Sequence, residues 1–219
     1  VTDANSCIVS ITETIASNQI LTLEEIIVNP SCFGFNNGSI NIVPGNGTTP
    51  YTYSWTNGAT IEDLNAITSG SYAVEVTDNN GCKISGSYTL TQPVVLQATE
   101  THTNVLCFGQ FNGTITTNVT GGTQPYSYLW NNGNNNPNLI NLDAGNYSLT
   151  VTDFNGCQVI VPVPITQPQL LTATTTQSNI SCFGQSTGSI DLTMTGGTGP
   201  YVYSWSNNAT TATSATSAT

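Results

Sequence analysis

Short segments in which apolar and polar residues alternate recur along the chain, and Gly- and Asn-rich turns separate them. The segments are rich in Val, Ile, Thr and Tyr, and alternation with a period of two places apolar side chains on one face of a β-strand. No stretch of useful length shows helical periodicity, and Pro and Gly interrupt any candidate helix. The pattern predicts an all-β chain, with strands in one period over residues 39–43, 51–55, 71–77 and 83–91.

The pattern repeats with a fixed length. The six cysteines are separated alternately by 25 and 50 residues, which gives a period of 75. Val-Thr-Asp, Cys-Phe-Gly, Pro-Tyr-x-Tyr-x-Trp and Thr-Gln-Pro recur in the same register without insertion or deletion. Such self-similarity is typical of a tandem array. About seven short strands in 75 residues predict a small immunoglobulin-like β-sandwich for each repeat.

The array divides into four parts. Residues 1–18 are expected to be the C-terminal strand segment of a preceding repeat, and residues 169–219 an incomplete repeat that ends in a low-complexity Thr/Ser/Ala tail over 210–219. Residues 19–93 and 94–168 are predicted to be two complete immunoglobulin-like repeats. Very short connections are expected at Gln92-Pro93 and Gln167-Pro168.

Composition narrows the possible partners. Only 6% of the residues are charged, with one Lys, no Arg and a net charge of −11. A chain nearly without cations cannot neutralise phosphates, which excludes nucleic acid and an anionic membrane surface as partners. No apolar run is long enough to span a bilayer, so we expect no membrane insertion of these residues. Six cysteines in so polar a chain indicate an oxidising compartment.

Two pairing schemes fit the cysteine spacing. Pairing inside each repeat joins Cys32 to Cys82 and Cys107 to Cys157 and leaves Cys7 and Cys182 to partners outside the chain. Pairing across the junctions joins Cys7 to Cys32, Cys82 to Cys107 and Cys157 to Cys182. The first scheme is favoured because a small sandwich benefits from a staple of its own. No Cys-x-x-Cys or Cys/His spacing supports zinc.

Three aromatic clusters recur with the period. In each, two Tyr and one Trp are spaced two apart and therefore share one face of a strand. The favoured interpretation is repeat core, because a small unit can spare few large apolar groups; the alternative is an exposed ladder that stacks on sugar rings. The expected core residues are Tyr53, Trp55, Tyr128, Trp130, Tyr203 and Trp205.

One acidic residue recurs just before a cysteine, as Asp3, Asp78 and Asp153. Its side chain can cap backbone N–H groups two residues further on, or it can contribute oxygen ligands to Ca²⁺. One recurrent carboxylate per repeat is few for a calcium site, so turn chemistry is favoured and no other cofactor is expected. No paired-carboxylate or nucleophile pattern is present, and we predict that the chain is not an enzyme.

The combination of motifs at residues 107–115, 125–130, 144–157 and 166–168 resembles the SprB repeat of very large cell-surface adhesins of gliding Bacteroidota. The resemblance extends fully over residues 19–168. It implies a secreted, extracellular and surface-exposed adhesin or filament, exported by the type IX pathway and linked to gliding motility or attachment, without catalytic residues.

The expected function is therefore a disulfide-stapled structural or adhesive array. The rival is a glycan-binding module that uses the Tyr/Trp ladders or the loops at 45–49, 120–124 and 195–199, and a third possibility is a purely structural sheath. Expected partners are neighbouring repeats or identical chains in a filament, and surface polysaccharide. Either one long continuous chain or head-to-tail assembly of separate chains would suit the repeat.

Overall fold

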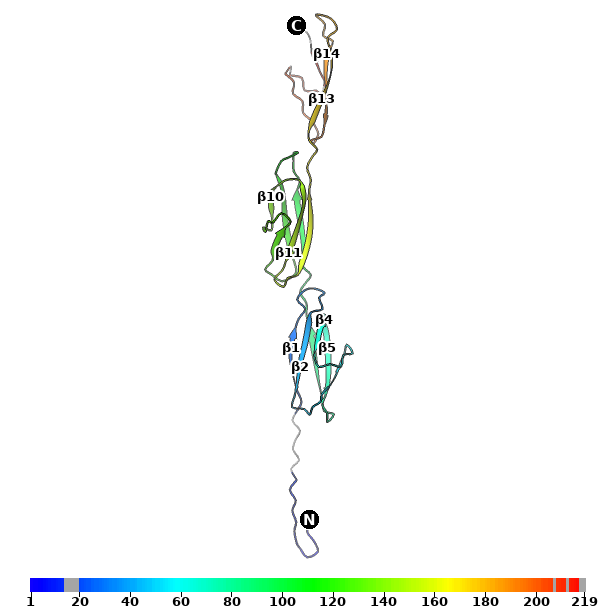
Figure 1. The fold of residues 1–219 in the computed structure, drawn as a ribbon, viewed down its shortest axis with the longest axis vertical. Coiled ribbons are helices and arrows are strands. Elements are labelled where there is room, and N and C mark those ends of the chain that lie inside the picture. Colours follow the sequence, from blue (N-terminus) through cyan, green and yellow to red (C-terminus); the bar gives the residue numbers. More distant parts are fainter. Residues whose placement is uncertain (14–19, 207, 212, 217–219) are drawn as a thin grey trace. The chain divides into compact units, whose positions relative to one another are not determined.

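The computed structural model describes residues 1–13, 20–206, 208–211 and 213–216, the last of these by their backbone. The expected boundary between residues 18 and 19 lies outside the described residues. The chain divides into two compact units, Val1–Pro93 and Val94–Thr219. Every regular element among the described residues is a β-strand (Figure 1), so the chain is all-β.

The first unit contains a sandwich of two three-stranded antiparallel sheets. One sheet has the order β1-β2-β4 and the other β3-β5-β6. Alternation is strongest in the middle of β2 and near the end of β5, where buried inward residues alternate with exposed outward residues. The strands are β1 (Thr22–Val28), β2 (Gly38–Gly45), β3 (Thr52–Trp55), β4 (Leu64–Ile67), β5 (Gly70–Thr77) and β6 (Lys83–Leu90).

The second unit repeats this sandwich 75 residues later in the sequence. Its sheets have the orders β7-β8-β10 and β9-β11-β12. The inward residues of β11 alternate strictly with half-buried ones, as the sequence pattern predicts. The strands are β7 (Gln97–Thr103), β8 (Gly113–Thr120), β9 (Ser127–Trp130), β10 (Leu139–Leu142), β11 (Gly145–Thr152) and β12 (Gln158–Ile165).

The strand order is that of an immunoglobulin-like sandwich. The two sheets correspond to strands A, B and E and to strands C, F and G of that fold, without strand D. The fold also has a characteristic corner, in which a Tyr near the start of strand F bonds back to the preceding backbone. Here the Tyr72 hydroxyl donates to the Thr68 carbonyl at 3.0 Å, and the Tyr147 hydroxyl to the Asp143 carbonyl at 3.3 Å. The described sandwiches have six strands each, one fewer than expected.

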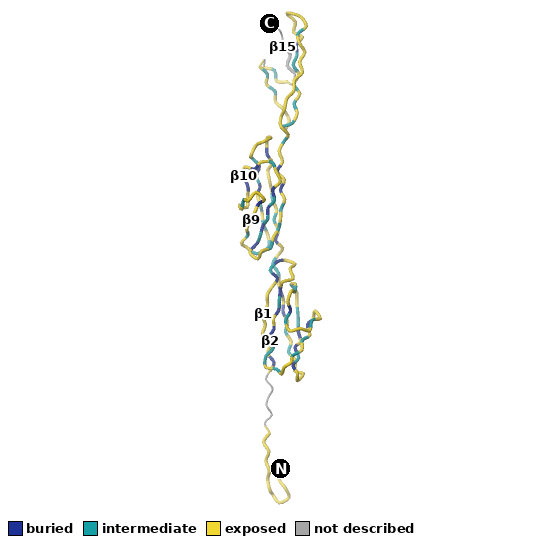
Figure 2. The backbone as a smooth tube through the Cα atoms, in the orientation of Figure 1, coloured by how far each residue is buried: buried dark blue, intermediate teal, exposed yellow. Residues whose placement is uncertain are grey.

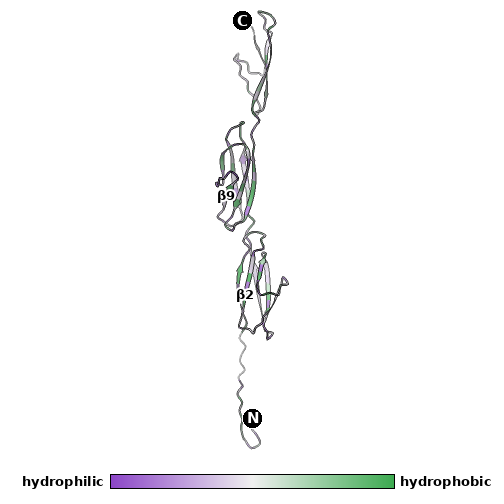
Figure 3. Cartoon of the chain, in the orientation of Figure 1, coloured by the Kyte–Doolittle hydropathy of each residue, from purple (hydrophilic) through white to green (hydrophobic). Residues whose placement is uncertain are grey.

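The core of each sandwich lies between its sheets. The buried residues line the inside of each sandwich (Figure 2), and apolar and polar positions alternate along the strands (Figure 3). In the immunoglobulin fold a disulfide joins strands B and F beside a Trp on strand C. Here the core residues of strands B and F include no cysteine and are aliphatic, apart from Tyr72 and Tyr147 on strand F. The second core contains Ile115, Trp130, Leu149, Val151 and Val163, and the first contains Ile40, Ile42, Trp55, Val74 and Val76.

The remaining described parts are one sheet and one turn. The sheet has the order β13-β14-β15 and repeats the first sheet of a sandwich, with β13 (Thr172–Ser178), β14 (Gly188–Thr195) and β15 (Thr213–Thr216). Part of the low-complexity tail thus pairs with β14. At the other end of the chain, residues 1–13 form a turn closed by a single bridge between Thr2 and Ile8.

Candidate functional site

Each repeat carries its cysteines in two loops at opposite ends of the sandwich. The chain enters each sandwich at one end, which we call the upstream end. It leaves at the opposite end, which we call the downstream end. Cys32 lies in the loop between β1 and β2, the downstream loop (29–37; 104–112 and 179–187 in the next repeats). Cys82 closes the turn between β5 and β6, the upstream turn (78–82; 153–157 in the second repeat).

Hydrogen bonds attach the downstream loop to the last residues of its own repeat. The Gly34 amide donates to Gln92 Oε1 at 2.7 Å, and the Thr91 amide donates to Asn29 Oδ1 at 2.8 Å. Cys32 therefore lies beside the end of β6, whereas Cys82 lies just before its start. The eight residues of β6 separate these two points by about 26 Å at about 3.3 Å per residue.

This separation corrects the favoured pairing. A disulfide requires Cα atoms about 4.4–6.8 Å apart, so Cys32 cannot bond to Cys82, nor Cys107 to Cys157, inside one sandwich. In the structure Cys32 and Cys157 are each disulfide-bonded, whereas Cys107 has a free thiol. The junction pairing is also wrong for Cys7 with Cys32 and for Cys157 with Cys182, because Cys7 and Cys182 have free thiols.

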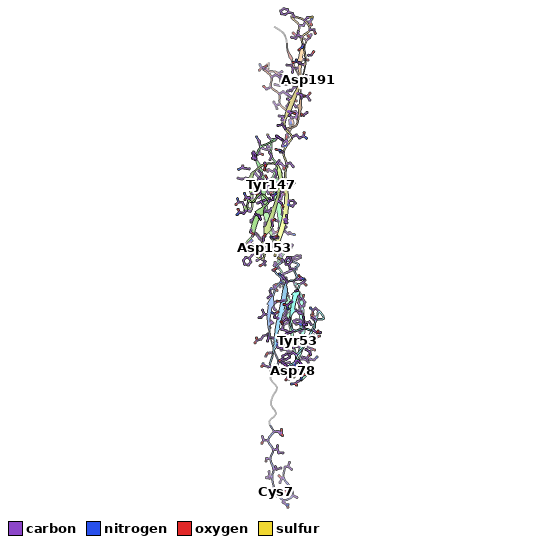
Figure 4. All side chains as sticks on the ribbon, viewed as in Figure 1. Cys7, Tyr53, Asp78, Tyr147, Asp153 and Asp191 are labelled. Atoms are coloured by element: carbon purple, nitrogen blue, oxygen red, sulfur yellow. The ribbon has the colours of Figure 1, made fainter. Side chains whose placement is uncertain are left out.

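The recurrent aspartate organises the upstream turn. Asp78 is buried, and its Oδ1 accepts the amides of Asn80 and Cys82 at 2.9 and 2.8 Å, while its Oδ2 accepts the Thr48 amide at 3.0 Å. These backbone donors, that of Thr48 foremost, hold the pKa of the Asp78 carboxyl below its usual value. Figure 4 shows Asp78 near the upstream end of its sandwich.

The same contacts recur in the other repeats. Asp153 accepts the amides of Asn155, Cys157 and Thr123 at 2.8–2.9 Å, and Asp3 accepts those of Asn5 and Cys7 at 2.9 and 2.8 Å. The carboxylate oxygens thus face N–H donors, which repel a cation. Among the described residues no group of three or more His, Cys, Asp or Glu side chains could hold a metal. The aspartates therefore provide turn chemistry here, and the arrangement does not fit calcium.

The structure places the recurrent tryptophans in the two complete cores. Trp55 is 4% exposed and Trp130 is 1% exposed. Their indole N–H groups donate to the carbonyls of Ile61 and Asn136, each at 2.9 Å. Tyr53 and Tyr128 are half-buried and pack against the same cores. Burial, followed by the nearby Glu62 carboxylate, raises the pKa of Tyr53 to about 12. None of these four rings forms an exposed platform for stacking on sugars.

In the third repeat the corresponding aromatic residues that the structure describes line a cavity. A cavity of about 490 Å³ is lined by Leu171, Leu192, Met194, Tyr203 and Trp205, among others. Trp205 is half-buried, and its indole donates to the Thr211 carbonyl at 2.8 Å. In the complete sandwiches this space is closed by β5 and β6 in the first repeat and by β11 and β12 in the second.

Sequence reasoning missed the residues that attach the connections between repeats. Gln92 and Gln167 accept the amides of Gly34 and Gly109 at 2.7 and 2.8 Å. On the other side of Pro93, the Val94 carbonyl accepts the Gly122 amide at 2.8 Å. The recurrence of Thr-Gln-Pro and of a Gly after each downstream Cys-Phe was the available signal, but it did not say which groups bond.

Two ion pairs lie on strands in the part of the chain that the structure describes. The Lys83 ammonium lies 2.6 Å from Glu75, and His102 Nδ1 lies 2.9 Å from Glu100 Oε2, both on strands. Within the same described residues, no helix is long and apolar enough to cross a membrane.

The family comparison matches the model of the SprB repeat at three places. The matched segments are residues 25–60, 99–135 and 174–210, which together make up half of the chain. Each match begins in the first strand of a repeat and ends just after the Pro-Tyr-x-Tyr-x-Trp segment. The matches follow the 75-residue period read from the cysteines. No curated protein matches the chain.

Comparison with solved structures finds immunoglobulin-domain proteins. The amphioxus IgVJ-C2 molecule is 16% identical with a TM-score of 0.28, and covers 69% of this chain and 99% of its own. A Dscam isoform structure is 14% identical with a TM-score of 0.32, covering 69% of this chain and 46% of its own. Murine CEACAM1b is 13% identical with a TM-score of 0.29, covering 67% and 99%. The assignment of the fold rests on the strand order and the tyrosine corner, not on these scores.

Proposed function

Because the chain belongs to the SprB repeat family, we propose that it is an extracellular repeat region of a bacterial surface adhesin or filament. In this role the sandwiches form a structural and adhesive array, and they do not catalyse a reaction. The observation that carries the proposal is the path of the chain through each sandwich. The chain arrives at one end and leaves at the other, as a string of spacers under tension requires.

The strand registers support a mechanical role. Thr22 pairs with Gly45 at the upstream end of the first sandwich, and Leu90 pairs with Gly70 at the downstream end. A force applied between the two ends of a sandwich therefore runs along β1 and β6. Antiparallel hydrogen bonds lie perpendicular to their strands, so such a force shears many bonds together and does not open them one at a time.

The connections between repeats support the same role. The Gln92 side chain is bonded within the first unit and the Val94 carbonyl within the second. Pro93 alone lies between these attached residues, and its ring restricts φ. Gln167 and Gln169 are likewise bonded, to Gly109 and Gly197, on either side of Pro168. Each connection between attached residues is thus a single proline.

The chemistry of the chain suits a cell surface. Two bonded cysteines are expected in an oxidising compartment and are rare in the cytosol. One Lys and no Arg leave trypsin-like proteases a single cleavage site. We extend the proposal to export by the type IX pathway and to a part in gliding or attachment, with neighbouring repeats or identical chains as partners.

The glycan-binding alternative loses its principal support. Its stacking platform would need exposed indole rings, and both tryptophans of the complete repeats are buried and hydrogen-bonded. The loops at 45–49 and 120–124 are held by bonds from their own repeat, such as that of the Gly47 amide to the Tyr51 hydroxyl at 3.1 Å. No feature of the described residues favours binding of polysaccharide over a structural role.

Labelling of intact cells tests the proposal. Antibodies raised against residues 20–168 should bind unpermeabilised cells that make the protein, and proteinase K treatment of those cells should remove the label. Label that appears only after permeabilisation would contradict a surface location. Monovalent Fab fragments of the same antibodies should reduce attachment of the cells to a surface. Labelling without any effect on attachment would restrict the role to spacing.

A further inference from the structure

The outer face of the sheet β9-β11-β12 carries large apolar side chains. Leu129 of β9 is 58% exposed and Ile160 of β12 is 65% exposed. Both are paired with Thr150 of the central strand β11, so the three side chains lie in one row across the sheet. Pro162 and Pro164 are also exposed and extend from Ile160 along β12, because alternate residues of a strand share a face. Contiguous exposed apolar side chains indicate an interaction surface, and we call these five residues the outer patch.

The fold of the repeat does not require the residues of the outer patch. In the first sandwich the same five positions are occupied by Ser54, Glu75, Ser85, Ser87 and Thr89. Ser54 and Ser85 are both paired with Glu75, as the corresponding residues of the second sandwich are paired with each other. The two sandwiches have the same strand order. The apolar side chains of the outer patch therefore serve a purpose other than the folding of their own repeat.

The charge of this face suits a second copy of the chain as the partner. The strands β9, β11 and β12, all of whose residues are described, contain no Asp, Glu, Lys, Arg or His. The whole chain has a net charge of −11, so two copies repel each other wherever their carboxylates meet. On the outer patch two copies can meet without this repulsion. A charged partner, in contrast, would find no ion pair there.

The geometry favours packing of one face on the other over pairing of strand edges. β12 is an edge strand of its sheet, and Pro162 and Pro164 have no N–H to donate to an added strand. Two sheets can instead pack face to face about 10 Å apart with interdigitated side chains, as the two sheets of a sandwich do. A contact between two identical faces is two-fold symmetric, so it closes after two chains.

We infer that the outer patch is a weak, reversible contact between identical chains that lie side by side. The eight residues of β11 and three strands about 4.8 Å apart outline a face of about 26 by 14 Å, or about 360 Å² per copy. Standard stable interfaces bury about 800 Å² per partner, so one pair of patches binds weakly. The inference deepens the proposed function, on which it rests for the many copies that one cell surface would present.

Analytical ultracentrifugation of the whole 219-residue chain tests the inference without cells. Free thiols are alkylated first, so that no covalent dimers form. From micromolar to millimolar concentrations the chain should shift from monomer towards dimer. The triple variant Leu129→Ser, Thr150→Glu and Ile160→Ser installs the residues of the first repeat and should raise the dissociation constant at least about tenfold, because it brings two carboxylates into the contact. The matched control Ile140→Asn, which alters a residue that is 70% exposed on the other sheet, should dimerise like the unaltered chain.

Amide chemical shifts followed by NMR during dilution locate the contact. The changes should concentrate on β9, β11 and β12, and they should be absent from the triple variant. An unchanged urea midpoint would show that the variant folds. If the midpoint falls, Thr150→Glu alone provides the test, because the central position of the first repeat carries Glu75.

Three outcomes would overturn the inference. These are a chain that stays monomeric up to millimolar concentration, a dimer that the folded variant forms equally well, and chemical-shift changes confined to other strands. The proposed function fails separately. A chain that dimerises through β9, β11 and β12 but is not labelled on intact cells would contradict the surface location and leave the contact standing. Labelled cells together with a monomeric chain would do the opposite.

Discussion

Replacement of Trp130 by Ala removes the largest side chain of the second core. The ring is 1% exposed and lies on β9, where Trp130 is paired with Leu149 of the central strand β11. Its indole N–H also donates to the Asn136 carbonyl at 2.9 Å. The neighbouring residue Leu129 points to the other face of the same strand and is 58% exposed, so it offers a matched substitution.

The size of the effect follows from burial. Truncation of a buried Trp to Ala costs about 3–5 kcal/mol. A repeat of 75 residues has a free energy of unfolding of about 4–11 kcal/mol, at about 0.05–0.15 kcal/mol per residue. Because 1 kcal/mol shifts the melting temperature of so small a domain by about 4–8 °C, Trp130→Ala should lower that of the second repeat by at least about 12 °C. Leu129→Ala should cost less than about 0.5 kcal/mol.

Calorimetry of the whole chain measures the difference between the two variants, with both kept under the same redox conditions. Urea titration followed by circular dichroism gives the free energies of unfolding. Equal shifts for Trp130→Ala and Leu129→Ala would refute the assignment of Trp130 to the core. A Trp130 variant that melts normally but loses affinity for a polysaccharide would instead make the ring a ligand-binding group.

Three further predictions follow from local geometry. Gly121→Ala should destabilise the second repeat by several kcal/mol more than Gly133→Ala. Both glycines have positive φ, but a Cβ at Gly121 would lie 1.9 Å from the Val95 carbonyl oxygen, whereas a Cβ at Gly133 would meet open space. Equal urea midpoints of the two variants would contradict this prediction. The pKa of Asp78 is lowered in the folded state, so its carboxylate stabilises the first repeat above the unfolded pKa of about 4, and this stability is lost as the pH falls through the lower folded pKa. In Asp78→Asn the melting temperature should therefore decrease less steeply as the pH is lowered. An unchanged dependence of melting temperature on acidic pH would contradict the role of Asp78 in the turn. Burial, with the hydrogen bond to Asp143, raises the pKa of Tyr147 to about 12, so the free energy of unfolding should fall as the pH rises from about 10 to 12. Tyr147→Phe should abolish this alkaline loss of stability and lower the free energy of unfolding at neutral pH by about 1–3 kcal/mol. An alkaline loss that persists in the variant would have to come from another group.

Strand prediction succeeded where one face of the strand is buried. The expected segments 71–77 and 83–91 correspond to β5 (Gly70–Thr77) and β6 (Lys83–Leu90), because alternation is strong there. The sequence pattern did not mark β1 (Thr22–Val28), since six of its seven residues are exposed. It also missed β4, which has only four residues.

The candidate site was less predictable because it depends on which loops share an end of the sandwich. Asp78 could be assigned to its turn from local sequence, since two of its three backbone donors, Asn80 and Cys82, lie within four residues. The third donor, Thr48, is 30 residues away. Nothing local distinguishes it from the other amides of its loop.

The sequence by itself determined the period, the all-β class and the family resemblance, because these depend on residue order and on alternation along single strands. The absence of nucleic acid among the partners is likewise a prediction from the sequence, because it rests on charge alone. Only the tertiary structure excluded the favoured cysteine pairing. Spacings of 25 and 50 residues measure separation along the chain, but a disulfide forms between atoms that are close in space. The length of β6 and β12 places the two cysteines of each repeat at opposite ends of a rigid sandwich, and this distance excludes the pairing that the spacing favoured.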